Sequence, residues 1–72
     1  MARHDPAYAA FLKRLRRART EASLSQSEAA RRLGKPQSFV SKCESGERRV
    51  DVVELTAFAR IYGVAVTYFY RT

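Results

Sequence analysis

The chain has 72 residues, a net charge of +7 at pH 7 and a sequence pI of about 10.3. A chain this short forms one domain with a thin core, since a small domain buries only about 60% of the surface that its unfolded chain exposes. It contains neither the roughly 20 consecutive apolar residues needed to span a bilayer nor the apolar segment of a secretory signal. Its single cysteine predicts a reduced, cytoplasmic protein without an internal disulfide.

The first predicted helix spans residues 6–21. Asp5 is a suitable N-cap residue, and Pro6 suits the first helical position. Apolar residues recur along this helix at spacings of three and four and form one stripe, made of Tyr8, Phe11, Leu12, Leu15 and Ala18. The basic residues at positions 13, 14, 16 and 17 lie largely outside this stripe. We interpret them as a solvated basic face, with direct DNA contact as the alternative.

Arginine provides 11 of the 14 basic residues. Its planar guanidinium grips phosphate as a fork, whereas the lysine ammonium is a point charge. A basic balance in a small domain therefore favours a polyanionic partner such as nucleic acid. The alternative is a solvated surface that keeps the protein in solution.

Residues 25–46 predict two short helices joined by a tight turn. Ser25 and Glu28 match a capping box at the start of a helix over residues 26–33, whose inward residues are Ala29, Ala30 and Leu33. Glycine 34 follows at the turn, where its lack of a Cβ permits the left-handed conformation required.

The next helix is predicted over residues 36–44, because Pro36 cannot continue the preceding helix and suits the start of a new one. Val40 and Cys43 are expected to point to the core. We interpret Cys43 as a buried small hydrophobe, with a reactive thiol as the alternative. The opposite face carries the polar residues Gln37, Ser38, Ser41 and Lys42.

Two further segments complete the pattern. Asp51 and Glu54 match a second capping box, and the helix that follows runs to Tyr62 with inward residues Val52, Leu55, Phe58, Ala59 and Tyr62. Residues 64–72 predict a short fifth helix. A strand is the second interpretation of this segment, because it contains two β-branched valines.

These elements predict an all-α fold, a compact bundle of about five short helices with a central helix-turn-helix. The domain is expected to occupy residues 1–72, with its core over about 8–70 and a frayed segment at 1–5. An enzyme is not expected, since His4 is the lone histidine and no carboxylate pair, activated nucleophile or metal-ligand cluster is evident. We predict no cofactor, no metal and no small-molecule ligand.

The sequence resembles the helix-turn-helix of the phage-repressor and Cro type, the XRE family, over roughly residues 12–69. We count Gln26 as the first position of the family's twenty-residue pattern. Ala30 then takes the small fifth position and Gly34 takes the turn. Val40 and Cys43 take the two late core positions. Two residues depart from the family: Cys43 is smaller than usual, and Lys35 stands where an apolar residue is common. Lys35 could instead reach outward to a phosphate.

The resemblance implies a sequence-specific regulator of transcription, most simply a repressor, that places the helix over 36–44 in the major groove of double-stranded DNA. It implies base contacts by Gln37, Ser38, Ser41 and Lys42. It implies phosphate contacts by Gln26, Lys35, Arg48 and Arg49. The residue between the base contacts, Phe39, could touch a thymine methyl group or pack over the corner between the two helices.

The family pattern also implies a buried ion pair between Arg19 and Glu44, which would tie the first helix to the helix that enters the groove. One helix reads few base pairs, so such proteins usually bind as two-fold homodimers with half-sites about 10 bp apart. We expect the dimer interface in the C-terminal aromatic cluster, formed by Tyr62, Tyr68, Phe69 and Tyr70. The alternative for Phe69 is that it closes the monomer core.

The second function class is a protein-interaction module that keeps this fold without using DNA. Such a module would act as an antitoxin or accessory subunit through a toxin or another protein partner. Single-strand or RNA binding is less favoured, because no sheet platform of exposed aromatic residues is evident. A membrane partner is not expected, since the apolar stripe of the first helix is needed for the core.

Overall fold

The computed structural model describes residues 6–70. Its four α-helices are α1 (Pro6–Glu21), α2 (Gln26–Leu33), α3 (Gln37–Ser45) and α4 (Val52–Tyr62), and a 3₁₀ helix, η1 (Val66–Phe69), follows them. The described part of the chain contains no strand, which confirms the predicted all-α fold. The strand considered for residues 64–72 is therefore wrong within the described residues, where the segment winds into η1 instead.

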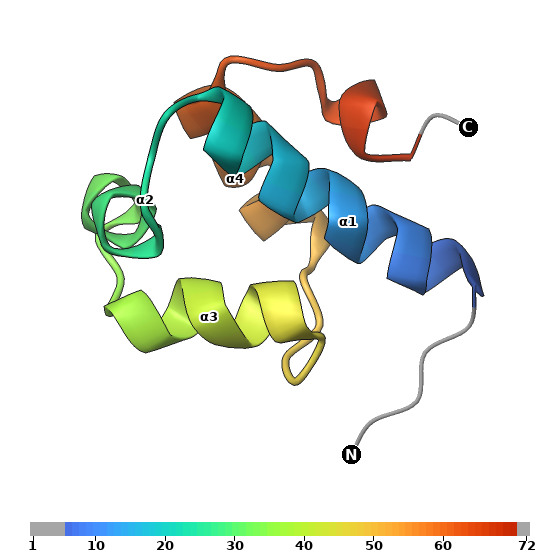
Figure 1. Cartoon of the computed structure of the whole chain (residues 1–72), viewed down its shortest axis with the longest axis horizontal. Helices are drawn as coiled ribbons and strands as arrows, with labels where there is room; N and C mark the ends of the chain where they lie inside the picture. Colours follow the sequence, from blue (N-terminus) through green and yellow to red (C-terminus); the bar gives the residue numbers. More distant parts are fainter. Residues whose placement is uncertain (1–5, 71–72) are drawn as a thin grey trace.

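The helices pack around one another so that α3 lies along an edge of the molecule (Figure 1). The two helices α2 and α3 pack against each other, α1 packs against α3 and η1, and α4 packs against α2 and η1. This arrangement supports α3 on its inner side and leaves its outer side to solvent.

Short-range signals in the sequence set the helix ends. The Ser25 side chain accepts a hydrogen bond from the Glu28 backbone N–H, and Asp51 with Glu54 forms a complete capping box. Gly34 closes α2 with φ +71°, the left-handed conformation that permits the tight turn. Pro36 acts as the N-cap of α3 rather than as its first residue, so this helix starts one residue later than predicted.

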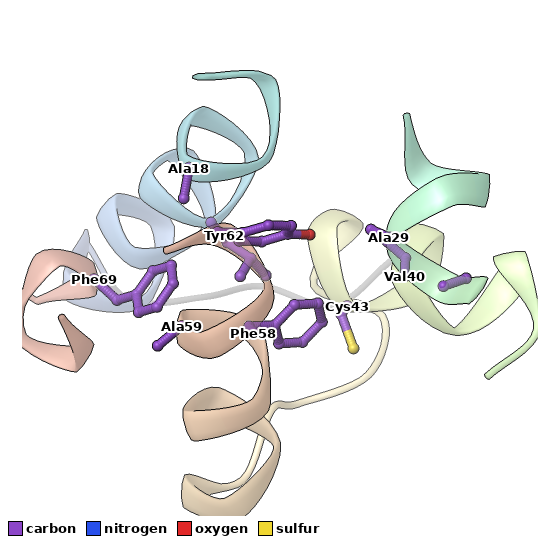
Figure 2. Close-up of a cluster of buried hydrophobic side chains, with 10 residues drawn as sticks. Ala18, Ala29, Val40, Cys43, Phe58, Ala59, Tyr62 and Phe69 are labelled. Carbon is purple, nitrogen blue, oxygen red and sulfur yellow. The ribbon is translucent and has the colours of Figure 1, made fainter. Parts of the chain in front are cut away.

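The core gathers apolar residues from every helix (Figure 2). Phe58 on α4 is fully buried at its centre, with the Phe39 ring stacked 6.2 Å away and the Tyr62 ring 5.8 Å away. Where α2 and α3 approach, the side chains are small, and Ala30 and Cys43 are at most 1% exposed. The buried apolar set is Leu15, Ala18, Ala29, Ala30, Val40, Cys43, Phe58, Ala59, Tyr62 and Phe69.

Tyr62 and Phe69, both expected in the dimer interface, are part of this core. This agrees with the inward position that helix periodicity predicted for Tyr62, and with the alternative that Phe69 closes the monomer core. Phe69 is 0% exposed and Tyr62 is 6% exposed, so neither can meet a second copy without unfolding its own chain. Their aromatic rings close the bundle under α1, where Phe11 lies edge-on to Phe69 at 6.1 Å. Tyr68 is half-buried, and of the predicted cluster Tyr70 alone is largely exposed, at 59%.

The first turn of α4 also departs from the prediction. Val52 was expected to face inward, yet it is 74% exposed, and the neighbouring Val53 is 75% exposed. The buried residues of α4 start only at Phe58, and Leu55 before it is half-buried against the core. The two valines thus form an exposed apolar pair beside the loop that follows α3.

The Tyr62 hydroxyl gives a test of this core. It is buried and has no hydrogen-bond partner among the described residues, and burial raises the pKa of Tyr62. Because an unsatisfied buried hydroxyl costs about 1–3 kcal/mol, we expect Tyr62→Phe to raise the free energy of unfolding by about 1 kcal/mol, or at least to leave it unchanged. Thermal denaturation followed by circular dichroism measures this change.

Tyr68→Phe serves as the matched control. The Tyr68 hydroxyl donates to a Glu21 carboxylate oxygen at 3.2 Å, at an exposed position, so its removal should lower stability slightly or not at all. A clear loss of stability in Tyr62→Phe would show that the hydroxyl has a partner in solution.

Candidate nucleic-acid interface

The interface is built on a buried carboxylate at the end of α3. The Glu44 side chain is 0% exposed, and the guanidinium of Arg19 on α1 pairs with it through two hydrogen bonds. Arg19 Nε lies 2.6 Å from Glu44 Oε2, and Arg19 Nη2 lies 3.1 Å from Glu44 Oε1. The hydrogen bonds from this arginine to Glu44 raise the pKa of Arg19. The structure thus brings together the two residues that the family pattern pairs.

The same carboxylate holds a side chain that faces the solvent. Gln26 Nε2, at the start of α2, donates to Glu44 Oε1 at 3.0 Å, and Gln37 Nε2, at the start of α3, donates to Gln26 Oε1 at 2.8 Å. The carboxamide of Gln37 is therefore oriented through Gln26 by a buried charge. Gln26 was predicted only as a phosphate contact, so its hydrogen bond with Gln37, 11 residues further along the chain, was missed.

The outer face of α3 carries short or flexible polar side chains. Ser38 and Lys42 are exposed and lie one helical turn apart, directly opposite the buried residues of this helix. Gln37 is also exposed, and Ser41 is half-buried, so these two lie on the flank nearer to α1 and the start of α2. The predicted base contacts thus share one side of α3, with Ser41 the least accessible of them.

The other flank of α3 is organised by Phe39. Its ring is half-buried against Phe58, which favours the corner-packing interpretation over contact with a thymine methyl group. Two cations lie over the same ring: Lys35 Nζ is 5.3 Å and the Arg48 guanidinium carbon is 4.8 Å from its centre. Such cation–π contacts fix the direction in which long basic side chains extend.

Arg48 is engaged within the domain. Its Nη1 and Nη2 each donate to a Glu54 carboxylate oxygen at 2.8 Å, and Nη1 also donates to the Arg49 carbonyl oxygen. The hydrogen bonds from Arg48 hold the pKa of Glu54 below its ordinary value. Arg48 was predicted to contact phosphate, but in this arrangement Glu54 occupies both ends of its fork. The sequence assigned Glu54 only to the capping box, so the ion pair was missed.

Arg49, the other predicted phosphate contact in this loop, lies over the Tyr8 ring, with its guanidinium carbon 4.4 Å from the ring centre. The Tyr8 hydroxyl in turn accepts a hydrogen bond from the Val50 backbone N–H at 3.2 Å. The start of α1 therefore anchors the loop that follows α3, and this loop presents Arg49 at the surface.

The described residues offer little to other kinds of chemistry. They contain no group of three or more histidine, cysteine or acidic residues that could hold a metal ion. Among residues 6–70, no helix is long and apolar enough to cross a membrane. Cys43 is fully buried, and burial raises the pKa of its thiol, so the unreactive thiol form is favoured.

A helix whose outer face is polar, preceded by a tight glycine turn and a supporting helix, defines a helix-turn-helix DNA-binding domain. The model of the family described as "Helix-turn-helix domain" matches residues 7–67, and the chain belongs to this family. The structure is similar to that of an XRE-family like protein from Pseudomonas syringae pv. tomato str. DC3000, with a TM-score of 0.82 and 48% identity over 88% of this chain and 77% of that chain.

No curated protein matches the sequence. The family and the similar structure together identify a DNA-binding regulator of the XRE type, a class whose typical members are not enzymes. The outer face of α3 is the surface through which such a domain meets DNA.

The buried pair allows a test of the scaffold. Glu44→Ala leaves the Arg19 guanidinium without its carboxylate, and we expect a loss of about 3–5 kcal/mol in the free energy of unfolding, which is enough to unfold so small a domain. Chemical denaturation measures the loss. Glu47→Ala removes the same charge at an exposed position three residues away and should have little effect. Equal stability of the two variants would show that the pair does not hold α1 to α3.

Proposed function

We propose that the protein represses transcription by binding a two-fold symmetric operator as a homodimer, with α3 of each copy in the major groove. The observation that supports this most directly is the exposed polar face of α3, on which Gln37, Ser38 and Lys42 are held by a rigid inner side. A major groove about 12 Å wide admits one α-helix with such side chains. Bound across a promoter, the dimer would exclude the transcription machinery.

The free hydrogen-bonding groups of Gln37 suit a contact with a base. One N–H of its carboxamide is used by Gln26, which leaves a second N–H and the oxygen free to form the two hydrogen bonds that adenine presents in the major groove. Lys42, more than one turn further on, can donate to O6 or N7 of guanine. Ser38 and Ser41 are short and fit either a base edge or a nearby phosphate.

The phosphate contacts would come from both flanks of α3. Gln26 lies on the flank nearer to α1, and Lys35 lies at the turn on the other flank, with Arg49 in the loop after α3. Arg48 contributes to phosphate binding only if its fork leaves Glu54, or if it uses the two donors that remain, Nε–H and the second Nη2–H. Contacts of this kind set the register of the protein on the duplex without reading its sequence.

The base contacts can be tested on duplexes selected from a random DNA pool at near-physiological salt. We expect the selected site to be a palindrome with half-sites about one helical turn apart. Gln37→Ala and Lys42→Gln should each relax the preference at one or two base pairs, by about 1–3 kcal/mol per pair. Binding is measured by fluorescence anisotropy on matched and mismatched duplexes.

Arg60→Gln is the control for Lys42→Gln, since it also removes one positive charge, from an exposed position near the end of α4. It should weaken binding slightly and leave the base preference unchanged. If the pool remains without a consensus and binding is weak and steeply salt-dependent, the operator proposal fails. The module that acts through a protein partner is then favoured.

A homodimer requires an exposed surface, and Tyr62 and Phe69 of the predicted aromatic cluster are buried. The exposed large hydrophobic residues of the described chain are Val52, Val53 and Tyr70. Val53 lines a hollow with Leu33, Lys35 and Phe39, at the turn where α3 begins. A two-fold axis beside the valines would therefore bring the starts of two α3 helices close together. We therefore place the self-association surface at the start of α4.

The double substitution Val52→Ser and Val53→Ser tests this surface, and it should leave the fold intact because both side chains are exposed. We expect it to reduce affinity for the full palindrome to that for a single half-site, with one copy bound per duplex in sedimentation experiments. Tyr70→Ser is the comparison. If Tyr70→Ser separates the copies and the valine variant does not, the dimer forms through the C-terminal segment, as the sequence predicted for Tyr70.

A further inference from the structure

Arg16 is a basic residue on α1 that lies next to α3. The DNA contacts proposed above assign it no role. Its side chain is 65% exposed, and its Nε lies 3.6 Å from Glu44 Oε1, beyond the distance of a hydrogen bond. Glu44 is already paired through two hydrogen bonds from Arg19. Arg16 therefore forms an ion pair with Glu44 but donates no hydrogen bond to it.

The position of Arg16 is fixed by the same carboxylate that orients the groove-facing residues. Glu44 Oε1 accepts from Gln26 Nε2 at 3.0 Å and faces Arg16 Nε at 3.6 Å, so Gln26 and Arg16 lie against a single oxygen atom. Gln26 in turn holds Gln37. Arg16 thus stands on the α1 flank of α3, immediately beside the side chains that face the groove.

A hollow of about 200 Å³ opens at this point, lined by Leu12, Lys13, Arg16 and Glu44. The carboxylate in its wall is buried and held by Arg19, while Lys13 and Arg16 at its rim are exposed cations. The hollow therefore has a surplus of positive charge at its mouth. An anionic oxygen group could reach both cations without displacing the hydrogen bonds from Arg19 to Glu44.

The opposite flank differs in this respect. There, Arg48 donates from both terminal nitrogens to Glu54 and lies over Phe39. An arginine whose fork is filled by a carboxylate has fewer donors to offer a phosphate. The flank that the sequence pattern assigned to phosphate through Arg48 is thus the one where this arginine is already engaged.

From this difference we propose that Arg16, with Lys13 beside it, binds a backbone phosphate of the DNA strand that runs along the α1 side of α3. The inference rests on the proposed entry of α3 into the major groove, because only then does a strand pass this flank. It replaces the interpretation of the α1 basic residues as a merely solvated face for two of them. Arg14 and Arg17, which line a second hollow with Ala10 and Lys13, are not part of this site.

The test compares Arg16→Gln with Arg17→Gln on the full chain. The two variants lose the same charge from neighbouring exposed positions of α1, so an effect of net charge alone would be equal in both. Binding to the selected duplex is measured by fluorescence anisotropy at several salt concentrations. Each lost phosphate contact lowers the steepness of log K against log salt by about 0.9.

We expect Arg16→Gln to lower this slope by about 0.9 and to weaken binding several-fold at all sequences, without a change in base preference. Arg17→Gln should leave the slope close to that of the unaltered chain. Arg16→Lys keeps the charge and should retain most of the slope. This variant keeps the proposal testable if Arg16→Gln folds poorly. Phosphate ethylation interference on the same duplex should lose one position per half-site in Arg16→Gln.

Equal slopes for Arg16→Gln and Arg17→Gln would overturn the phosphate site while leaving the proposed function standing. Failure of the proposed function has a different signature: the unaltered chain would then show no selected site, and Lys42→Gln would behave like Arg60→Gln. An unchanged interference pattern in Arg16→Gln would likewise refute the contact, even if binding were weaker.

Discussion

The buried carboxylate of Glu44 is the constraint on which the arrangement of the first three helices depends. A charge at a fully buried position must be met by partners, because removing it from water costs several kcal/mol. Arg19 and Gln26 meet that charge from α1 and α2, and their hydrogen bonds fix α3 against both helices. The same requirement sets the direction of Gln37 at the start of α3, so that stability and the presentation of a groove-facing amide have one cause.

Small side chains make this arrangement possible. Ala29 and Ala30 on α2 and Cys43 on α3 are fully or almost fully buried, and larger residues there would push the two helices apart. Cys43 is smaller than the residue that the family pattern usually carries, and the Phe39 and Phe58 rings stacked on each other fill the adjoining part of the core. The stack also lies under two cations, so packing in the core determines where Lys35 and Arg48 extend.

Local sequence signals predicted the helices well, because caps and turns depend on residues close in the chain. Ser25, Gly34 and the pair Asp51 and Glu54 each act where they were expected. The errors concern contacts between distant segments. Aromatic residues near the end of a chain suit an interface or a core equally, and only the fold shows that Phe69 lies in the core. Similarly, the capping role of Glu54 gave no sign that it also holds Arg48, since that contact depends on the path of the loop after α3.

The acidic side chains explain why the net charge of the chain indicates a polyanionic partner but does not show which basic residues contact it. In the described part of the chain, Glu28, Glu44 and Glu54 form ion pairs with five arginines between them. Three of these arginines also donate hydrogen bonds to a carboxylate, so part of their hydrogen-bonding capacity is filled before any ligand arrives. The charge available to a polyanion is therefore concentrated on the residues left with free donors, such as Lys42 on the outer face of α3 and Arg16 beside it. Because the ion pairs select these residues, the acidic side chains determine the shape of the positive surface as much as the basic ones do.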